Sequence, residues 1–127
     1  MNRLLSIFAL ATVAAPAFAA SSTPVTTGCH AALTVVDARS LAEATPNARA
    51  FVANYGAKLA TTVKSQGVST ASIYVTADDP KHGSTEVGLY TVSLRTGHVT
   101  DDDMEPAEDA KTAAVRAKLM ARHCAGQ

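Results

Sequence analysis

Two neighbouring runs near the middle of the chain alternate apolar and polar residues, and they constrain the fold more than any other feature. Between positions 71 and 77 the odd residues are Ala, Ile, Val and Ala, and the even residues are Ser, Tyr and Thr. A second run extends from Thr85 to Arg95. A period of two is typical of a half-buried strand. The residues from 78 to 84 are turn formers, so the two runs predict an antiparallel hairpin.

The apolar phase changes within the second run. Apolar residues occupy odd positions up to Leu89 and even positions from Tyr90 onward. A β-bulge near Gly88 would return both sets to one face of the strand. A tight Thr-Gly turn at 96–97 then leads to a short strand around Val99, which completes a three-stranded meander.

Two segments carry helical spacing. Residues 44–66 place apolar side chains three and four positions apart, with Thr45 as N-cap and Gly67 as the stop. The predicted apolar stripe comprises Ala48, Phe51, Val52, Tyr55, Leu59 and Val63. Residues 106–123 predict a second helix, because acidic residues lie at its start and basic residues at its end, as the helix dipole favours.

These elements predict one small α+β domain. An antiparallel meander of three to four strands spans residues 71–100, and two helices pack on one face of it. Residues 31–37 are expected to form an edge strand. A chain of 127 residues leaves no room for a second domain with its own core.

The first 19 residues predict an export signal. Arg3 precedes an apolar run from Leu4 to Ala15, and Ala17-Phe18-Ala19 supplies the small residues that signal peptidase accepts. The apolar run is too short to span a bilayer, and no second such run follows, so we expect no membrane span in the mature form. Residues 20–28 are rich in Ser, Thr and Pro and are expected to be a flexible leader before the domain at 29–127. The expected location is periplasmic or secreted.

One cysteine lies near each end of the expected domain, at Cys29 and Cys124. An oxidising compartment favours a disulfide bond between them, closing a loop of 95 residue steps (124 − 29). In the chain-entropy model such a bridge contributes about 4–5 kcal/mol. The neighbouring His30 and His123 leave open a metal site made from both Cys-His pairs, but adjacent ligands diverge in direction, so the disulfide is favoured.

Charge and motifs narrow the function classes. The 11 basic and 11 acidic residues balance, which gives no positive field for nucleic acid. No recognised nucleophile, phosphate-binding or metalloprotease motif appears, so we expect neither catalysis nor a cofactor. The acidic segment 101–109 could hold a cation, but its spacing differs from a calcium loop and fits helix capping better. Candidate binding residues are His82 in the polar turn and the exposed strand residues Tyr74 and Arg95.

The stretch from Gly88 to Val99, Gly-Leu-Tyr-Thr-Val-Ser-Leu-Arg-Thr-Gly-His-Val, resembles the end of a PepSY-type domain, in which a strand, a Thr-Gly turn and a short Val-containing strand recur. The long turn at 78–84, the terminal helix and the two cysteines depart from that pattern. The resemblance implies a non-catalytic module of exported proteins, of a kind associated with protease inhibition or regulation.

The sequence therefore predicts an exported, non-enzymatic domain that binds another exported protein, as an inhibitor or immunity-type factor of the periplasm. The alternative is a metal or small-ligand binding protein that uses His30, His123 and acidic residues. A hydrolase whose site has no recognisable motif is a third hypothesis.

Overall fold

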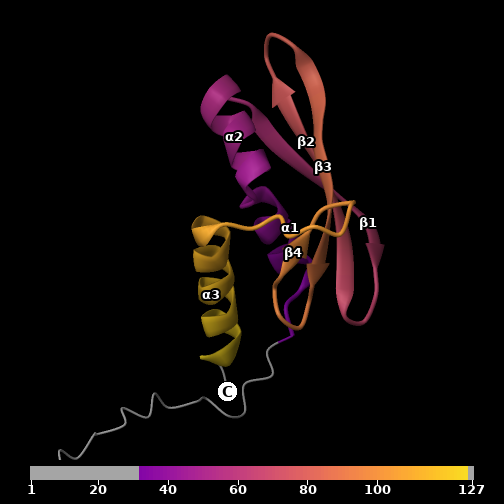
Figure 1. Ribbon diagram of the computed structural model, residues 1–127, viewed down its shortest axis with the longest axis vertical. Helices are drawn as coiled ribbons and strands as arrows, with labels where there is room; N and C mark the ends of the chain where they lie inside the picture. Colours follow the sequence, from indigo (N-terminus) through magenta and orange to yellow (C-terminus); the bar gives the residue numbers. More distant parts are fainter. Residues whose placement is uncertain (1–31, 126–127) are drawn as a thin grey trace, which may run out of the picture.

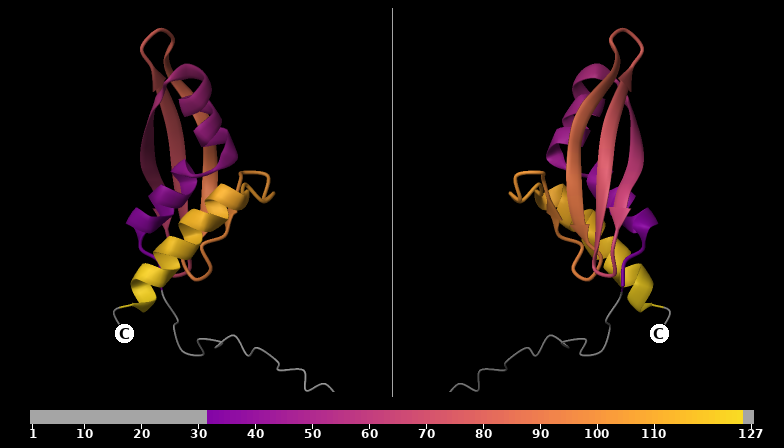
Figure 2. Two further views of the ribbon diagram at one scale, coloured as in Figure 1. Left: turned by 90° about the vertical axis from the view of Figure 1, so that its left-hand side faces the viewer. Right: turned by 90° about the vertical axis from the view of Figure 1, so that its right-hand side faces the viewer.

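A computed structural model describes residues 32–125 (Figure 1). In this part of the chain, two helices come first, the strands follow, and a last helix ends it. Their order is α1 (Val35–Glu43), α2 (Pro46–Tyr55), β1 (Lys58–Gln66), β2 (Thr70–Asp79), β3 (Gly83–Ser93), β4 (Val99–Thr100) and α3 (Ala110–Cys124). The strands form one antiparallel sheet in the order β1-β2-β3-β4. The predicted α+β class and meander are confirmed. In the two side views, the helices lie in front of the sheet from one direction and behind it from the other (Figure 2).

The predicted helix over 44–66 is wrong in its second half. Helix α2 ends at Tyr55, because Gly56 adopts the left-handed conformation (φ 61°) and caps the helix. The chain then continues as β1, in which Leu59, Thr61 and Val63 are half-buried and alternate with exposed residues. Leu59 and Val63 are four positions apart, a spacing that fits a helical stripe and a strand face equally well.

The predicted edge strand over 31–37 is also wrong, because residues 32–34 form no strand and lead into helix α1, which begins at Val35. Thr34 and Asp37 form a reciprocal capping box, in which each side chain accepts a hydrogen bond from the other residue's backbone N–H. The helix buries Ala38, Leu41 and Ala42. Residues 32–125 therefore contain three helices rather than the two expected.

The sheet presents one buried face to the helices. On β2 the residues Ala71, Ile73, Val75 and Ala77 are buried, as the alternation predicted. The bulge is confirmed: the register between β2 and β3 shifts so that Val87 has no partner opposite it. Val87 and Tyr90 consequently both reach the core.

The bulge does not bring Leu89 to the core face, which corrects the prediction for that residue. Leu89 is only half-buried and lies opposite Tyr74, on the other face of the sheet. The phase change therefore divides the apolar residues of β3 between the two faces, with Leu89 on the uncovered one.

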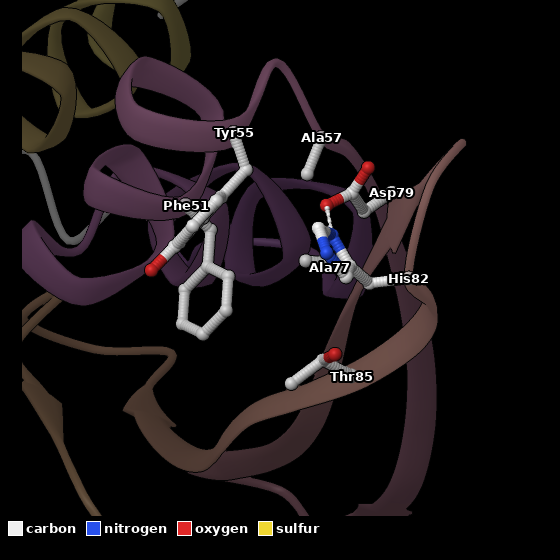
Figure 3. Close-up of a pocket in the computed structure, with 7 residues that line it drawn as sticks. All are labelled: Phe51, Tyr55, Ala57, Ala77, Asp79, His82 and Thr85. Carbon is white, nitrogen blue, oxygen red and sulfur yellow. Dashed lines mark hydrogen bonds and ion pairs between the residues drawn. The ribbon is translucent and has the colours of Figure 1, made fainter.

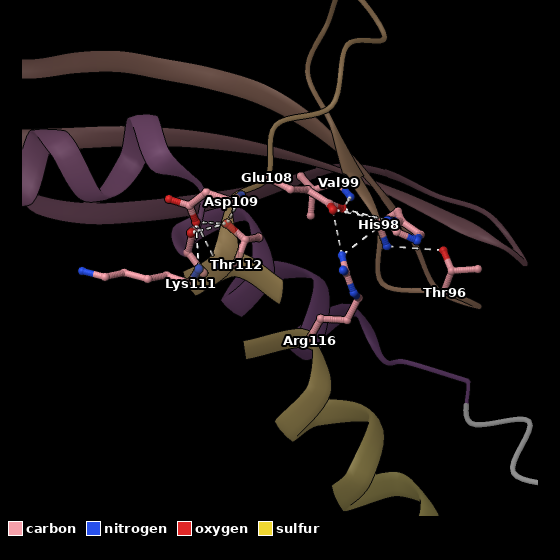
Figure 4. A network of polar contacts seen from close by, with 9 residues as sticks. Thr96, His98, Val99, Glu108, Asp109, Lys111, Thr112 and Arg116 are labelled. Carbon is pink, nitrogen blue, oxygen red and sulfur yellow. Dashed lines mark hydrogen bonds and ion pairs between the residues drawn. The ribbon is translucent and has the colours of Figure 1, made fainter. Parts of the chain in front are cut away.

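Helix α3 begins at Ala110 rather than at Pro106. Pro106 forms a bridge with Thr100, and Asp109 caps the helix by accepting hydrogen bonds from the backbone N–H groups of Lys111 and Thr112 (Figure 4). The Thr112 hydroxyl then donates to the carbonyl of Ala44 at 2.9 Å, which joins α3 to the end of α1. The exposed Asp109 cap and the buried Thr112 hydroxyl thus fix where the last helix sits.

A second polar cluster ties the segment before α3 to β4. The Glu108 carboxylate accepts hydrogen bonds from the Val99 N–H at 2.6 Å and from Arg116 at 2.8 Å, and it also contacts His98 (Figure 4). Burial alone would raise the pKa of Glu108, but the hydrogen bonds from Arg116 and Val99 outweigh it and lower the pKa. Within residues 32–125, none of the helices has the length and apolar character that a membrane crossing requires.

Candidate functional site

A pocket opens between the C-terminal end of α2 and the β2–β3 hairpin (Figure 3). Its volume is about 280 Å³. We call it the aromatic pocket; it is lined by Phe51, Tyr55, Ala57, Ala77, Asp79, His82 and Thr85. Helix α2 and both strands of the hairpin therefore contribute to it.

Two aromatic rings form one wall of the aromatic pocket. Phe51 and Tyr55 are one turn apart on α2, and their ring centroids lie 5.8 Å apart in a tilted arrangement. Because Ala57 and Ala77 have small side chains, the space beside the two rings stays open. Tyr55 is 59% exposed and the adjacent Val52 is 44% exposed, so the apolar surface continues outward from the pocket.

A carboxylate–imidazole pair borders the aromatic pocket on the hairpin side. His82 Nδ1 lies 2.6 Å from Asp79 Oδ2, and the Lys81 N–H donates to Asp79 Oδ1 at 2.8 Å. The hydrogen bond from His82, followed by that from Lys81, lowers the pKa of Asp79. The aspartate thus orients the ring of His82 beside an apolar cavity. Such a combination can hold an apolar group inside and offer polar contacts at its edge.

The three predicted binding residues do not meet at one site. His82 lies in the turn between β2 and β3 and contributes to the aromatic pocket. Arg95 follows β3 and lies in the turn toward β4. Tyr74 lies in the middle of β2, with the Lys64 ammonium 4.9 Å from its ring centroid. Burial, followed by the negative charge of Glu86, raises the pKa of Tyr74.

The predicted metal alternative involves His123, which contacts a buried carboxylate. His123 Nε2 lies 2.7 Å from Asp37 Oδ2, and Asp37 is 6% exposed. Burial would raise the pKa of Asp37, but hydrogen bonds from the Thr34 N–H and from His123 outweigh it and lower the pKa. Across residues 32–125 no three His, Cys, Asp or Glu side chains are grouped so that they could hold a metal ion.

The disulfide prediction also reaches beyond the described part of the chain. Cys124 occupies the last position of α3 and is half-buried. Cys29 and His30 lie outside the described residues, as do the expected signal at 1–19 and leader at 20–28. The bridge between Cys29 and Cys124 therefore stays a prediction.

The acidic segment 101–109 forms turn and cap contacts. Asp101 Oδ1 accepts hydrogen bonds from the backbone N–H groups of Asp103 and Glu105. Asp109 caps α3 and also pairs with Arg49 of α2. The Thr112 N–H, joined by Arg49, lowers the pKa of Asp109 to about 2.

The sequence pattern did not predict that Phe51 and Tyr55 line a pocket. Both belong to the apolar stripe of the predicted longer helix, where they were expected to face the core. Gly56 is the residue that could have distinguished them from core residues. A glycine inside a helical pattern can end the helix, which leaves the last aromatic ring at the C-terminus of the helix.

Comparisons with known proteins give no relative: no protein-family model matches the chain, and no curated protein and no solved structure matches it either. The resemblance of residues 88–99 to a PepSY-type domain stays a prediction.

Proposed function

We propose that this protein is an exported, non-enzymatic domain that binds another exported protein, as an inhibitor or immunity-type factor in the periplasm or outside the cell. The aromatic pocket receives an apolar side chain of that partner. Asp79 and His82 contact polar groups beside that side chain.

The observation that carries this proposal is the exposed aromatic wall of the pocket. Tyr55 is 59% exposed, and it is not among the residues that form the buried core. Tyrosine is enriched among the residues that dominate protein interfaces, because it buries a large ring and keeps a polar end. A cavity of about 280 Å³ beside this ring can enclose one apolar side chain.

The proposed location rests on the sequence. The residues from 1 to 19 have the parts of an export signal in the right order, and the two cysteines suit an oxidising compartment. N-terminal sequencing of the mature protein is expected to begin at Ala20. An intact Met1 on protein recovered from the cytosol would contradict export.

The binding experiment compares the mature protein with two variants, each tagged and exposed to periplasmic and culture extracts. Tyr55→Ser removes the more exposed ring of the aromatic wall and leaves Phe51 in place. Val68→Ser is the matched control, because Val68 is 95% exposed in the turn between β1 and β2, away from α2. We expect the wild type and Val68→Ser to retain the same protein, and Tyr55→Ser to lose it.

The retained protein is then purified and its affinity measured directly by calorimetry. We expect Tyr55→Ser to weaken binding by at least about tenfold, as loss of a tyrosine hot spot does. Equal affinity for wild type and Tyr55→Ser would contradict a role of the pocket in binding.

The metal alternative is tested by elemental analysis of protein purified without an affinity tag. His123 already contacts Asp37, so a metal would have to compete with this ion pair and recruit His30 from outside the described residues. Stoichiometric zinc or copper, lost on substitution of His123, would favour the alternative over the protein-binding proposal.

A further inference from the structure

Strand β3 is paired along only part of its outer edge. It extends from Gly83 to Ser93, but β4 pairs with it only at Thr91 and Val92. After Thr100 the chain folds into a turn closed by the Asp101 N–H and the Glu105 carbonyl at 2.9 Å. Among residues 32–125, no strand continues β4 along positions 83–90. Apart from the Val87 carbonyl, which accepts a hydrogen bond from Asn47, this part of β3 therefore presents backbone groups that a further strand could pair with.

A groove lies beside this unpaired edge. It has a volume of about 360 Å³, and we call it the edge groove. Its lining comes from the start of α2, the middle of β3 and the loop after β4, and comprises Thr45, Pro46, Asn47, Val87, Gly88, Leu89, Tyr90, Asp101, Asp102 and Ala107. The amide of Asn47 donates to the Val87 carbonyl at 2.9 Å, which fixes the start of α2 against β3.

The edge groove and the aromatic pocket lie along the same two elements. Asn47, Phe51 and Tyr55 are spaced by four on α2, so they share one face of the helix. Asn47 lines the edge groove, and the two aromatic residues line the aromatic pocket. On β3, Thr85 borders the pocket and Val87 borders the groove. One extended segment can therefore reach both.

The opposite edge of the sheet is protected against strand addition. Strand β1 carries Lys58 and Lys64, and its pairing with β2 is irregular between Val63 and Ser65. Lysines keep a strand edge from pairing with other chains, and because β3 has a bulge of its own at Val87, it is the lysines that distinguish the two edges. The residues of β3 from 83 to 90 contain no lysine, and Glu86 is their only charged residue.

The edge groove is bordered by uncompensated negative charge. The loop after β4 carries Asp101, Asp102, Asp103 and Glu105, and Asp101 and Asp102 line the groove itself. Within the described chain, none of these four carboxylates forms an ion pair with Lys, Arg or His. A segment bearing Lys or Arg would supply the missing positive charge.

We infer that the partner contributes an extended, basic segment that adds as a strand to β3 at positions 83–90, in line with β4. Backbone hydrogen bonds hold the segment, and its Lys or Arg side chains lie over the loop 101–105. This inference rests on the proposed function, because the same segment places its apolar side chain in the aromatic pocket.

The test uses nuclear magnetic resonance of the isotope-labelled mature protein with a synthetic peptide in which Val and Lys alternate. One control peptide carries Glu in place of each Lys, and another has every second backbone nitrogen methylated. We expect the Val-Lys peptide to slow amide exchange within residues 83–90 and not within β1. Both control peptides are expected to lose this effect.

A charge variant tests the second part of the inference. The triple variant Asp102→Asn, Asp103→Asn, Glu105→Gln is expected to weaken binding of the Val-Lys peptide by at least about fivefold. Glu43→Gln is the matched control, because Glu43 ends α1 and does not line the edge groove. Equal binding of the Lys and Glu peptides, or protection of β1 instead of β3, would overturn the inference.

The outcomes separate the inference from the proposed function. A natural partner whose binding depends on Tyr55, but whose complex leaves amide exchange at 83–90 unchanged, would overturn strand addition and leave the proposed function intact. Protection at 83–90 without any dependence on Tyr55 would instead remove the aromatic pocket from the binding site.

Discussion

Gly97 is the glycine that the described fold can least replace. Its φ is 75°, and a Cβ atom at this position would lie 2.8 Å from Cγ of Arg116. Arg116 cannot move freely, because it donates to Glu108 at 2.8 Å. The glycine therefore allows both the turn between β3 and β4 and the close approach of α3.

We predict that Gly97→Ala lowers the free energy of unfolding by more than about 1–2 kcal/mol, since the left-handed strain and the steric conflict add. Gly83→Ala is the matched control: its φ is 78°, but an added Cβ meets nothing within 4 Å. Urea unfolding measures both variants. Equal losses for the two would show that the contact with Arg116 carries no cost.

The cap of α3 makes stability depend on pH in acid. The folded pKa of Asp109 is about 2, below its ordinary value of 3.8, so the unfolded chain binds the proton more readily. Its contribution is therefore complete above the unfolded pKa and is lost as the pH falls toward the folded pKa.

We predict that Asp109→Asn flattens the dependence of unfolding free energy on pH between about pH 2 and pH 5. Denaturant unfolding across that range measures the slope. Asp102→Asn is the control, because Asp102 neither caps α3 nor forms an ion pair with it, and its substitution is expected to leave the wild-type slope. An unchanged slope in Asp109→Asn would contradict the assignment.

At the scale of elements, α3 is attached through a buried hydroxyl. Thr112 is fully buried, and it donates to the Ala44 carbonyl while also accepting from the Asp109 N–H. We predict that Thr112→Val, which keeps the shape of the side chain, costs about 1–3 kcal/mol, because the Ala44 carbonyl keeps only its hydrogen bond from Arg49 Nε and the Asp109 N–H loses its acceptor. Thr62→Val on exposed β1 is the control and is expected to be nearly neutral. Thermal unfolding compares the two.

The elements also show where sequence patterns are sufficient and where they are not. The hairpin over β2 and β3 was predicted with its bulge, because alternation has only one structural interpretation there. The structure of residues 44–66 was not predicted correctly. Leu59 and Val63 fit both the helical and the strand period, and only the conformation of Gly56 decides between a helix and a strand. The aromatic pocket could not be predicted, because it depends on where α2 ends relative to the hairpin.

At the scale of the whole molecule, the predicted bridge between Cys29 and Cys124 joins the two ends of the domain. Replacing both cysteines by serine is expected to lower the unfolding free energy by about 4–5 kcal/mol, from the entropy of the opened loop. Alkylation of the unreduced, denatured protein followed by mass measurement counts the thiols. Two alkylated cysteines would contradict the bridge.

The contact between Asp37 and His123 joins residues 86 positions apart, in the first and last helices. During synthesis, α1 and the sheet leave the ribosome well before α3 does. This contact between the two helices therefore cannot form until His123 has emerged. On the proposed export, a translocation channel that receives the chain from its N-terminus would therefore take up residues that have not yet formed this contact.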